Sequence, residues 1–572
     1  MKYIIQDWSK ENDGILFFIQ RLQEMLFHYS DDIVRAPVHN TQTLINEYIS
    51  VEKDVLKGKV KQYQLDEIIH ELKESLLEDK ILKEKYNLSI IEDIANSLTQ
   101  KKSPLVHYLN SMVSETDYYD DCIEYLKKHV VDASHKKEIE FALRAWVASV
   151  VWYGYSPEYI YRHLRSFFDT KVDNPIEKLE EFLNRFDFKP KNYKVYFVFY
   201  AKAKNYKTLL NERLHISFED DGNFQKLKKN PEAFVGVIEM DGYDSCGAIQ
   251  RAYSALNIFL RFYRAFTNKR EELIGKSALV INEEMQEDLI LPVKALGYKN
   301  IEATPGRTYA DEIDTVVLGC QGKTKETYLR LNKIVDLHNA ALKQQDLNDA
   351  FVNLWSVLEV VSTNIGEGAK IESVIKGITP ILQSDYYTTV FENIMVDLQN
   401  NLSKQEYGKI MAEIEETCAD VAKIACFVLL DKYEKLREEV FKTMLCHYPN
   451  IRNKIYNLYL KRNNKMSLKN DAEKYRKRVS WHIYRLYRVR NAIVHAGESH
   501  KRIQVLGEHL HIYVDAIIME LMIKLATDPH LNSIEDVLID TELLIKRKYD
   551  FSTTENIEYS DIELMLEHYF IK

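Results

Sequence analysis

The sequence predicts a mainly α-helical protein with a small α/β segment in its middle, and three observations lead to this prediction. The 572 residues include only 18 glycines and 11 prolines, so tight turns are few. Apolar residues recur every three or four positions along most of the chain, which is the period of an amphipathic helix. Short runs of β-branched and aromatic residues concentrate between residues 190 and 322.

These changes of pattern divide the chain into four segments, and a chain of this length can form several hydrophobic cores. We expect an N-terminal helical domain, a small central α/β domain, a C-terminal helical bundle and an acidic C-terminal tail. They cover residues 1–189, 190–322, 323–528 and 529–572.

The N-terminal segment repeats apolar residues at helical spacing, as in Ile15, Phe18, Ile19 and Leu22. In the central segment, β-branched and aromatic runs predict strands at 195–200, 214–218, 234–239, 278–281 and 315–318, with a helix at 249–266. Acidic residues near these strands could form a carboxylate site, although solvated strand ends and turns explain them more simply. They are Glu219, Asp220, Asp221, Glu239, Asp241 and Asp244.

Helical periodicity returns in the C-terminal segment. It predicts helices at 324–343, 347–364, 371–383, 386–401, 404–441, 476–495 and 503–525. Residues 461–477 are dense in charge, and we expect a flexible insertion there. In the acidic tail, 557–570 is the best helix candidate, and the tail could cover the basic patch described next or a neighbouring subunit.

Charge and cysteine content restrict the class of protein. The net charge of −10 argues against general nucleic-acid binding, but residues 451–490 hold 13 Lys or Arg against Asp471 and Glu473, a local net charge of +11. Such a patch is expected of a phosphate-binding surface. The six cysteines lack metal-ligand spacing, which favours reduced thiols. Without a signal peptide or a long apolar run, we expect a cytoplasmic protein that does not cross a membrane.

The segment 484–497 carries the strongest candidate site. Its apolar residues follow a helical period, and Gly497 stands where a C-cap glycine would end the helix. In a helix, Asn491 and His495 are four residues apart and share a face, and the long side chain of Arg490 can reach the same helix end. Imidazole is the natural acid–base near neutral pH, and guanidinium is the natural partner of phosphate oxygens. RNA cleavage by the adjacent 2′-hydroxyl needs both functions and no metal ion.

The sequence Arg490-Asn491-Ala492-Ile493-Val494-His495 resembles the Arg-Asn-x-x-x-His motif of HEPN domains. The upstream stretch 351–359 resembles an early helix of Apea-like HEPN domains from bacterial abortive-infection systems. The resemblance covers about residues 325–527 and makes the C-terminal segment an HEPN-like helical bundle.

The resemblance implies an endoribonuclease in anti-phage defence, independent of metal ions and cofactors. Its catalytic residues would be Arg490, Asn491 and His495, and its products would carry 2′,3′-cyclic phosphate and 5′-hydroxyl ends. HEPN nucleases usually pair, which implies a homodimer through this bundle. A phage-derived trigger sensed by the N-terminal or central domain would activate it. The alternative is a non-catalytic HEPN module that binds RNA or mediates dimerisation.

Other side chains are assigned supporting roles. Glu359 could hold Arg490 or His495 in place, or form a salt bridge without a catalytic role. Aromatic rings and cations before the motif could stack on RNA bases and bind phosphates, with helix packing or simple solvation as the alternatives. They are Tyr484, Tyr487, Arg485, Arg488, Arg476, Lys477 and Arg478.

Two further patterns give weaker hypotheses. Residues 316–324 place Gly-Lys-Thr between an apparent strand and a helix, as in a P-loop, but only two residues separate the glycines where that loop needs four, so a plain strand-to-helix turn is favoured. A histidine cluster comprises His482, His500, His509 and His511. Because His509 and His511 point to different faces of a helix, we predict no metal site.

Overall fold

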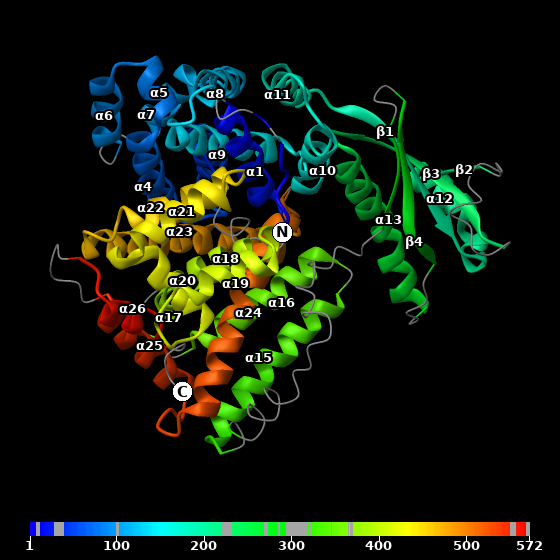
Figure 1. Ribbon diagram of the computed structural model, residues 1–572. Helices are drawn as coiled ribbons and strands as arrows, with labels where there is room; N and C mark the ends of the chain where they lie inside the picture. The colour runs from blue at the N-terminus through cyan, green and yellow to red at the C-terminus, as the bar shows by residue number, and fades with distance from the viewer. Residues whose placement is uncertain are drawn as a thin grey trace.

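The protein is a helical body with a small antiparallel sheet on one side (Figure 1). The structure, a computed structural model, describes residues 1–6, 8, 12–27, 39–98, 102–219, 232–267, 273–283, 287–292, 319, 322–344, 346–363, 365, 370–500, 502–549 and 556–567. The predicted class, mainly α with a small part that contains strands, is confirmed. In the described part of the chain, no helix is both long and apolar enough to cross a membrane.

The N-terminal segment is helical, as predicted, and several of its helices begin at polar caps. Asn40 forms a capping box with Thr43, Ser114 accepts from the Asp117 backbone, and Asn174 precedes a proline at the first helical position. The helices are α1 (Asp13–Leu26), α3 (Thr41–Leu56), α4 (Tyr63–Glu78), α5 (Lys80–Lys85), α6 (Leu88–Ser97), α7 (Lys102–Met112), α8 (Glu115–Val130), α9 (Lys136–Tyr153), α10 (Pro157–Phe168) and α11 (Pro175–Leu183).

Helix α1 is buried almost completely and links the first residues of the chain to the segment before α22. The side-chain amide of Gln20 donates to the carbonyl oxygens of Ile4 (3.0 Å) and His447 (2.9 Å). At Gly14 a Cβ atom would lie 2.3 Å from the carbonyl oxygen of Val130, so only glycine lets α1 approach the end of α8 this closely. The N-terminal helices therefore pack against C-terminal helices and do not form a separate body.

The central segment forms a five-stranded sheet in the order β2-β3-β1-β4-β5, and every neighbouring pair is antiparallel. Helix α13 packs on one face, and that face belongs to the same hydrophobic core as the N-terminal helices. The elements are β1 (Lys191–Phe199), η2 (Ala201–Tyr206), α12 (Lys207–Leu214), β2 (Ser217–Glu219), β3 (Phe234–Gly242), α13 (Ser245–Thr267), β4 (Ile274–Asn282) and β5 (Glu287–Pro292).

The strand predictions need two corrections. The run at 214–218 is not one strand, because α12 extends to Leu214, His215 turns the chain with φ 53°, and β2 begins only at Ser217. Strand β5 was not predicted, since it pairs at the edge of the sheet and its sequence lacks a clear β-branched run. The strand predicted at 315–318 lies outside the described residues.

The stretch predicted as one C-terminal bundle contributes to two hydrophobic cores. One core surrounds the end of the long helix α23, and the other is built by the helices between α17 and α23 together with α26. The first contains α15 (Lys325–Lys343), α16 (Leu347–Val361), α17 (Lys370–Ser384), α23 (Lys465–Asn491), α24 (Ile503–Thr527) and α25 (Ile534–Lys548). The second contains α18 (Tyr386–Asn401), α19 (Lys404–Ala412), α20 (Asp420–Leu429), η4 (Asp431–Tyr433), α21 (Glu434–Thr443), α22 (Pro449–Tyr459) and α26 (Tyr559–Met565).

The predicted flexible insertion at 461–477 is wrong. Asn464 caps α23 by accepting from the backbone of Ser467, and the helix then runs unbroken through the charged stretch. Ion pairs of Lys461 with Asp471 and of Lys465 with Asp561 hold its beginning. The charged side chains that suggested a solvated loop are paired with carboxylates, and one of these, Asp561, lies almost a hundred residues further along the chain.

The acidic tail packs into the body of the same chain. Helix α25 contributes Ile534 and Val537 to the core around α23, and α26 contributes Ile562 to the second core. Arg476 of α23 pairs with Glu542 of α25 at 3.3 Å. The expectation that the tail covers basic residues therefore holds for this contact, and the described tail residues are part of the fold.

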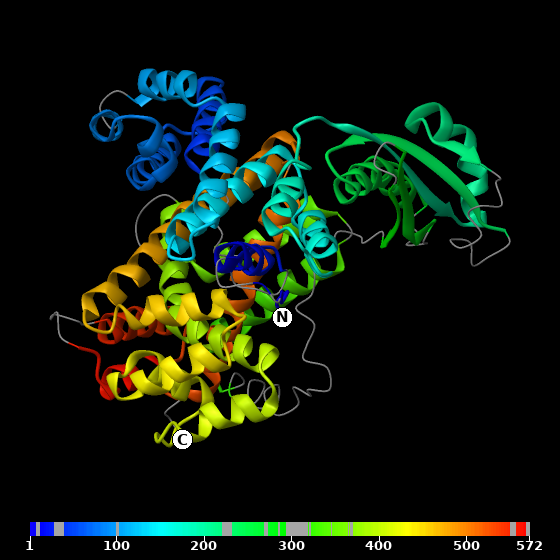
Figure 2. The ribbon, with the colours of Figure 1, turned by 45° about the horizontal axis from the view of Figure 1, so that its top comes forward.

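A buried ion cluster joins α23 to the N-terminal helices, which lie side by side with it in Figure 2. Glu47 of α3 accepts two hydrogen bonds of 2.7 Å from Arg485, which also contacts Glu71 of α4 at 2.7 Å. Arg488 donates to Glu47 as well. Burial alone would raise the pKa of Glu47, but Arg485, His39 and Arg488 outweigh it and hold this pKa well below its usual range.

Replacing Glu47 with alanine should destabilise the protein strongly, because Arg485 and Arg488 would remain buried without their main partner. We expect a loss of about 3–5 kcal/mol in the unfolding transition that includes α23, measured by urea denaturation. Glu84→Ala serves as the control, because it removes an exposed pair with Lys128 and should cost less than about 1 kcal/mol. Equal effects of the two substitutions would contradict the role of the cluster.

Candidate active site

The motif lies where α23 ends. Its last residues pass from the α-helix into a wider π-helical turn, η5 (Ala492–Ala496), and Gly497 closes it in the left-handed conformation with φ 65°. Gly497 is thus the terminating glycine that the sequence predicts, and L-residues with a side chain are disfavoured there. Single π-turns occur often at functional sites, and this one was not visible in the sequence.

Arg490 is held by groups on both sides. Its Nη1 donates to Oδ1 of Asn491 at 3.1 Å, and its Nη2 lies 3.5 Å from Oε1 of Glu359. The Nε atom of Arg490 is buried and has no hydrogen-bond partner among the described residues. The structure therefore brings together Arg490, Asn491 and Glu359, as the sequence suggested.

Glu359 itself contacts two further groups, one on its own helix and one at the start of α17. Its Oε1 accepts from the indole Nε1 of Trp355 at 2.9 Å, and its Oε2 pairs with Lys370 at 2.9 Å. Both Glu359 and Trp355 lie on α16, which packs beside α23 and η5. A carboxylate held this firmly fixes the direction of the Arg490 guanidinium.

His495 has a different environment. Its side chain is exposed on the π-turn, beside exposed Val494, and makes no hydrogen bond or ion pair with the described residues. No such contact joins it to Arg490 or Asn491 either, so the structure pairs the arginine with the asparagine and leaves the imidazole open to solvent. An exposed imidazole is able to exchange protons with a ligand, and Arg490 lies five residues before His495 at the same end of α23.

The other predicted RNA-binding side chains all contact partners within the chain, some buried and some at the surface. Arg485 is buried, and Arg488 pairs with Glu47. The ring of Tyr484 packs against Tyr63 at 6.5 Å, and that of Tyr487 packs against Trp355 at 5.6 Å. The remaining pairs are Arg476 with Glu542, Lys477 with Glu74, and Arg478 with Glu78.

The basic patch of the sequence is largely neutralised in space. Twelve of the 13 Lys and Arg residues between 451 and 490 form an ion pair with a described carboxylate, and Lys469 does not. The twelve are Arg452, Lys454, Lys461, Arg462, Lys465, Lys474, Arg476, Lys477, Arg478, Arg485, Arg488 and Arg490. In this conformation the local charge of +11 does not form an open phosphate-binding surface.

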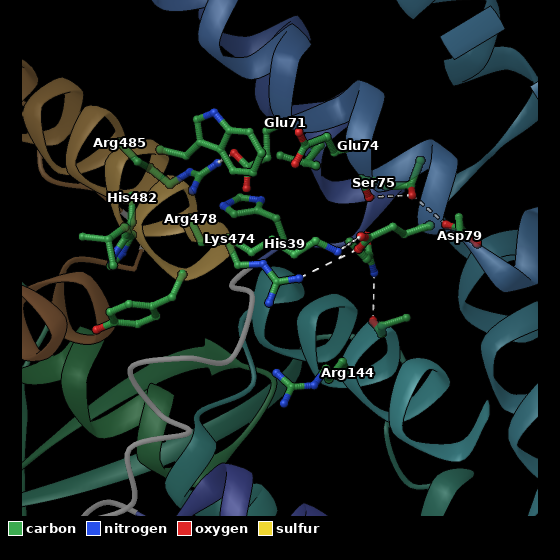
Figure 3. Close-up of a pocket in the computed structure, with 18 of the residues that line it drawn as sticks. His39, Glu71, Glu74, Ser75, Asp79, Arg144, Lys474, Arg478, His482 and Arg485 are labelled. Carbon is green, nitrogen blue, oxygen red and sulfur yellow. Dashed lines mark hydrogen bonds and ion pairs between the residues drawn. The ribbon is translucent and has the colours of Figure 1, made fainter. Parts of the chain in front are cut away.

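A cavity of about 560 Å³ lies at the junction between α23 and the N-terminal helices (Figure 3). Carboxylates of α4 and cations of α23 line it, among them Glu78 paired with Lys474. His39 lines it, and both of its ring nitrogens are buried without a hydrogen-bond partner among the described residues. Oε2 of Glu47 lies 3.8 Å from Nε2 of His39. None of Arg490, Asn491 and His495 lines this cavity.

The histidines of the sequence cluster separate into two groups. Nδ1 of His482 lies 2.9 Å from the hydroxyl of Tyr513, and its Nε2 lies 3.3 Å from His509. His511 points elsewhere and contacts His338 and Asp515. No pattern in the sequence pointed to His338, which lies 173 positions before His511.

Neither the P-loop hypothesis for 316–324 nor the hypothesis of a carboxylate site near the strands gains support. Lys323 donates to the carbonyl oxygens of Asp528 and Leu531 (3.0 and 2.7 Å), and Thr324 caps α15. This part of 316–324 is the start of a helix, and most of the rest lies outside the described residues. Asp244 accepts from the hydroxyl of Ser156 at 2.9 Å and so ties α10 to α13; Asp220 and Asp221 also lie outside the described residues.

No protein-family model, curated protein or solved structure matches this chain.

Acidification should weaken the junction around Arg485. Burial lowers the pKa of His39 and His482 well below the ordinary value and that of His500 to about 3, with nearby arginines adding to the effect. Because the unfolded chain protonates these histidines first, stability is lost as pH falls below about 6.5, by about 1.4 kcal/mol per pH unit for each histidine. Thermal unfolding between pH 7.5 and 5.5 measures this slope.

His500→Gln is the matched variant for this measurement. It removes one of the three titrating groups and should reduce the slope by about 1.4 kcal/mol per pH unit. A slope unchanged by the substitution would show that other groups cause the acid sensitivity.

Proposed function

We propose that this protein is a metal-independent endoribonuclease that cleaves RNA by attack of the 2′-hydroxyl on the adjacent phosphate. His495 transfers the proton, Arg490 binds the phosphate oxygens, and Asn491 positions Arg490. The observation that carries the proposal is the end of α23, where an exposed imidazole follows a guanidinium fixed by Glu359 and Asn491. A fixed donor beside the reacting phosphate stabilises charge in the transition state without reorganising.

The alternative is a non-catalytic module that binds RNA or joins two subunits. The pairing of Arg490 with Glu359 favours it, because a cation already paired has less to offer a phosphate. The long distance of 3.5 Å and the exposed state of His495 favour catalysis, since a phosphate can compete for this guanidinium and reach the imidazole. The two readings differ in whether covalent cleavage depends on His495.

In the proposed setting, the nuclease belongs to a bacterial abortive-infection response and is kept silent until a phage-derived trigger acts. The contact between α23 and the N-terminal helices supports this part of the proposal. Arg485 and Arg488 reach an RNA strand only if they leave Glu47 and Glu71. A signal that separates these helices would therefore release cations directly before the motif.

His495→Ala should reduce RNA cleavage by a factor of about 10²–10⁴, the usual contribution of one acid–base group. The measurement is cleavage of total RNA by the full chain, with the ends mapped as 2′,3′-cyclic phosphate and 5′-hydroxyl. His530→Ala is the control, since it removes another exposed histidine that lies outside the motif. If His495→Ala cuts RNA as fast as the unchanged protein, His495 is not catalytic.

A homodimer should form through the bundle that carries the motif. One motif supplies one imidazole, whereas transesterification uses both a base and an acid. Two-fold pairing of the same surface would bring a second His495 to the site and cover exposed Val494. Light scattering should show a dimer, and activity per chain should fall on dilution below its dissociation constant. A monomer with undiminished activity would exclude the shared site.

A further inference from the structure

Three metal-binding side chains converge on one point between α15 and α24. Nε2 of His338 lies 3.0 Å from Nε2 of His511 and 2.9 Å from Oδ1 of Asp515. The third edge, from Nε2 of His511 to Oδ1 of Asp515, measures 3.4 Å. The three donor atoms thus form a nearly equilateral triangle.

The two helices place these side chains by their periodicity. His511 and Asp515 are four residues apart on α24 and therefore share a face, and His338 comes from α15, which packs against that face. Leu331 and Ile334 of α15 lie in the same core as Leu510 and Val514 of α24. The apolar contacts on this side fix the distance between the helices and hence the width of the triangle.

Hydrogen bonds alone satisfy this arrangement poorly. Each neutral imidazole carries a single N–H, so the one hydrogen between two facing Nε2 atoms cannot also serve the Asp515 carboxylate. When that hydrogen serves one of the two contacts, lone pairs face each other at the other contact, and a cation at the centre relieves this repulsion.

The dimensions fit a first-row transition metal. Ligand atoms about 2.0–2.1 Å from Zn²⁺ stand about 3.3 Å apart in a tetrahedral arrangement and about 2.9 Å apart in an octahedral one. The observed edges of 2.9 and 3.0 Å lie near the octahedral value, and the edge of 3.4 Å lies close to the tetrahedral one. Two imidazoles also select against Mg²⁺ and Ca²⁺, which prefer oxygen ligands only.

We propose that His338, His511 and Asp515 bind one divalent transition-metal ion, with Zn²⁺ as the best-fitting ion, and that the ion clamps α15 to α24. The side chains of His338 and Asp515 are 18% and 31% exposed, so the site is open to solvent and a water molecule can complete the coordination. The ion is separate from the proposed RNA chemistry, which uses side chains of α23 and η5. It stabilises the same helical core that carries the motif.

Zn²⁺ titration of the untagged, metal-stripped full chain tests the site. Isothermal calorimetry should show one Zn²⁺ per chain, and the midpoint of thermal unfolding should rise with Zn²⁺ concentration because the ion binds the folded state. Mg²⁺ at the same concentrations should produce neither effect. Absence of saturable Zn²⁺ binding would overturn the proposal and leave a hydrogen-bonded histidine pair.

Variants assign the ion to these ligands. Asp515→Asn and His338→Ala should each weaken Zn²⁺ binding by at least about 100-fold and abolish the thermal stabilisation. Asp336→Asn, which changes an exposed carboxylate on the same helix α15, should bind Zn²⁺ like the unchanged protein. Both ligand positions are partly exposed, and circular dichroism verifies that the variants fold. Unchanged Zn²⁺ affinity in Asp515→Asn would place the ion elsewhere.

Discussion

The buried contact of Arg485 with Glu47 and Glu71 is the interaction on which the arrangement of this protein depends. Arg485 belongs to α23, whereas its partners lie more than 400 positions earlier on α3 and α4. Charges removed from water must remain paired, because the loss of one partner leaves the other without solvation. The cluster therefore fixes the N-terminal helices against the helix that carries the motif, and the position of α23 cannot change without separating them.

This constraint also changes how the charge of the sequence is understood. The excess of cations between 451 and 490 suggests an RNA-binding surface only as long as their partners are unknown. In space, acidic residues such as Asp13, Glu78 and Glu542 come from distant parts of the chain and neutralise them. What remains near the motif is Arg490 with its single long contact to Glu359 and the exposed His495. Recognition at this end of α23 accordingly depends on a few groups rather than on an extended patch.

Local periodicity predicted most of the helices, because burial of one apolar face is encoded within each helix. Gly497 was recognised because a left-handed C-cap has a strong residue preference, and the link between Glu359 and Arg490 followed from the expected packing of their helices. Long-range pairing could not be predicted in the same way. Periodicity does not identify the distant partners on which three features depend. These are the helical structure within 461–477, the strand β5 and the contact of His338 with His511.

The candidate active site and the histidine–aspartate triangle share one hydrophobic core. Val489 of α23 and Ile493 of η5 pack into the core that contains Leu331 of α15 and Leu510 of α24. A metal ion between α15 and α24 would hold these two helices of the core together. The ion cluster around Arg485 holds α23 against the N-terminal helices α3 and α4. Because close-packed cores have low compressibility and transmit strain, both contacts limit the positions that the π-turn can occupy. The geometry of Arg490 and His495 is thus set by constraints that lie outside the motif itself.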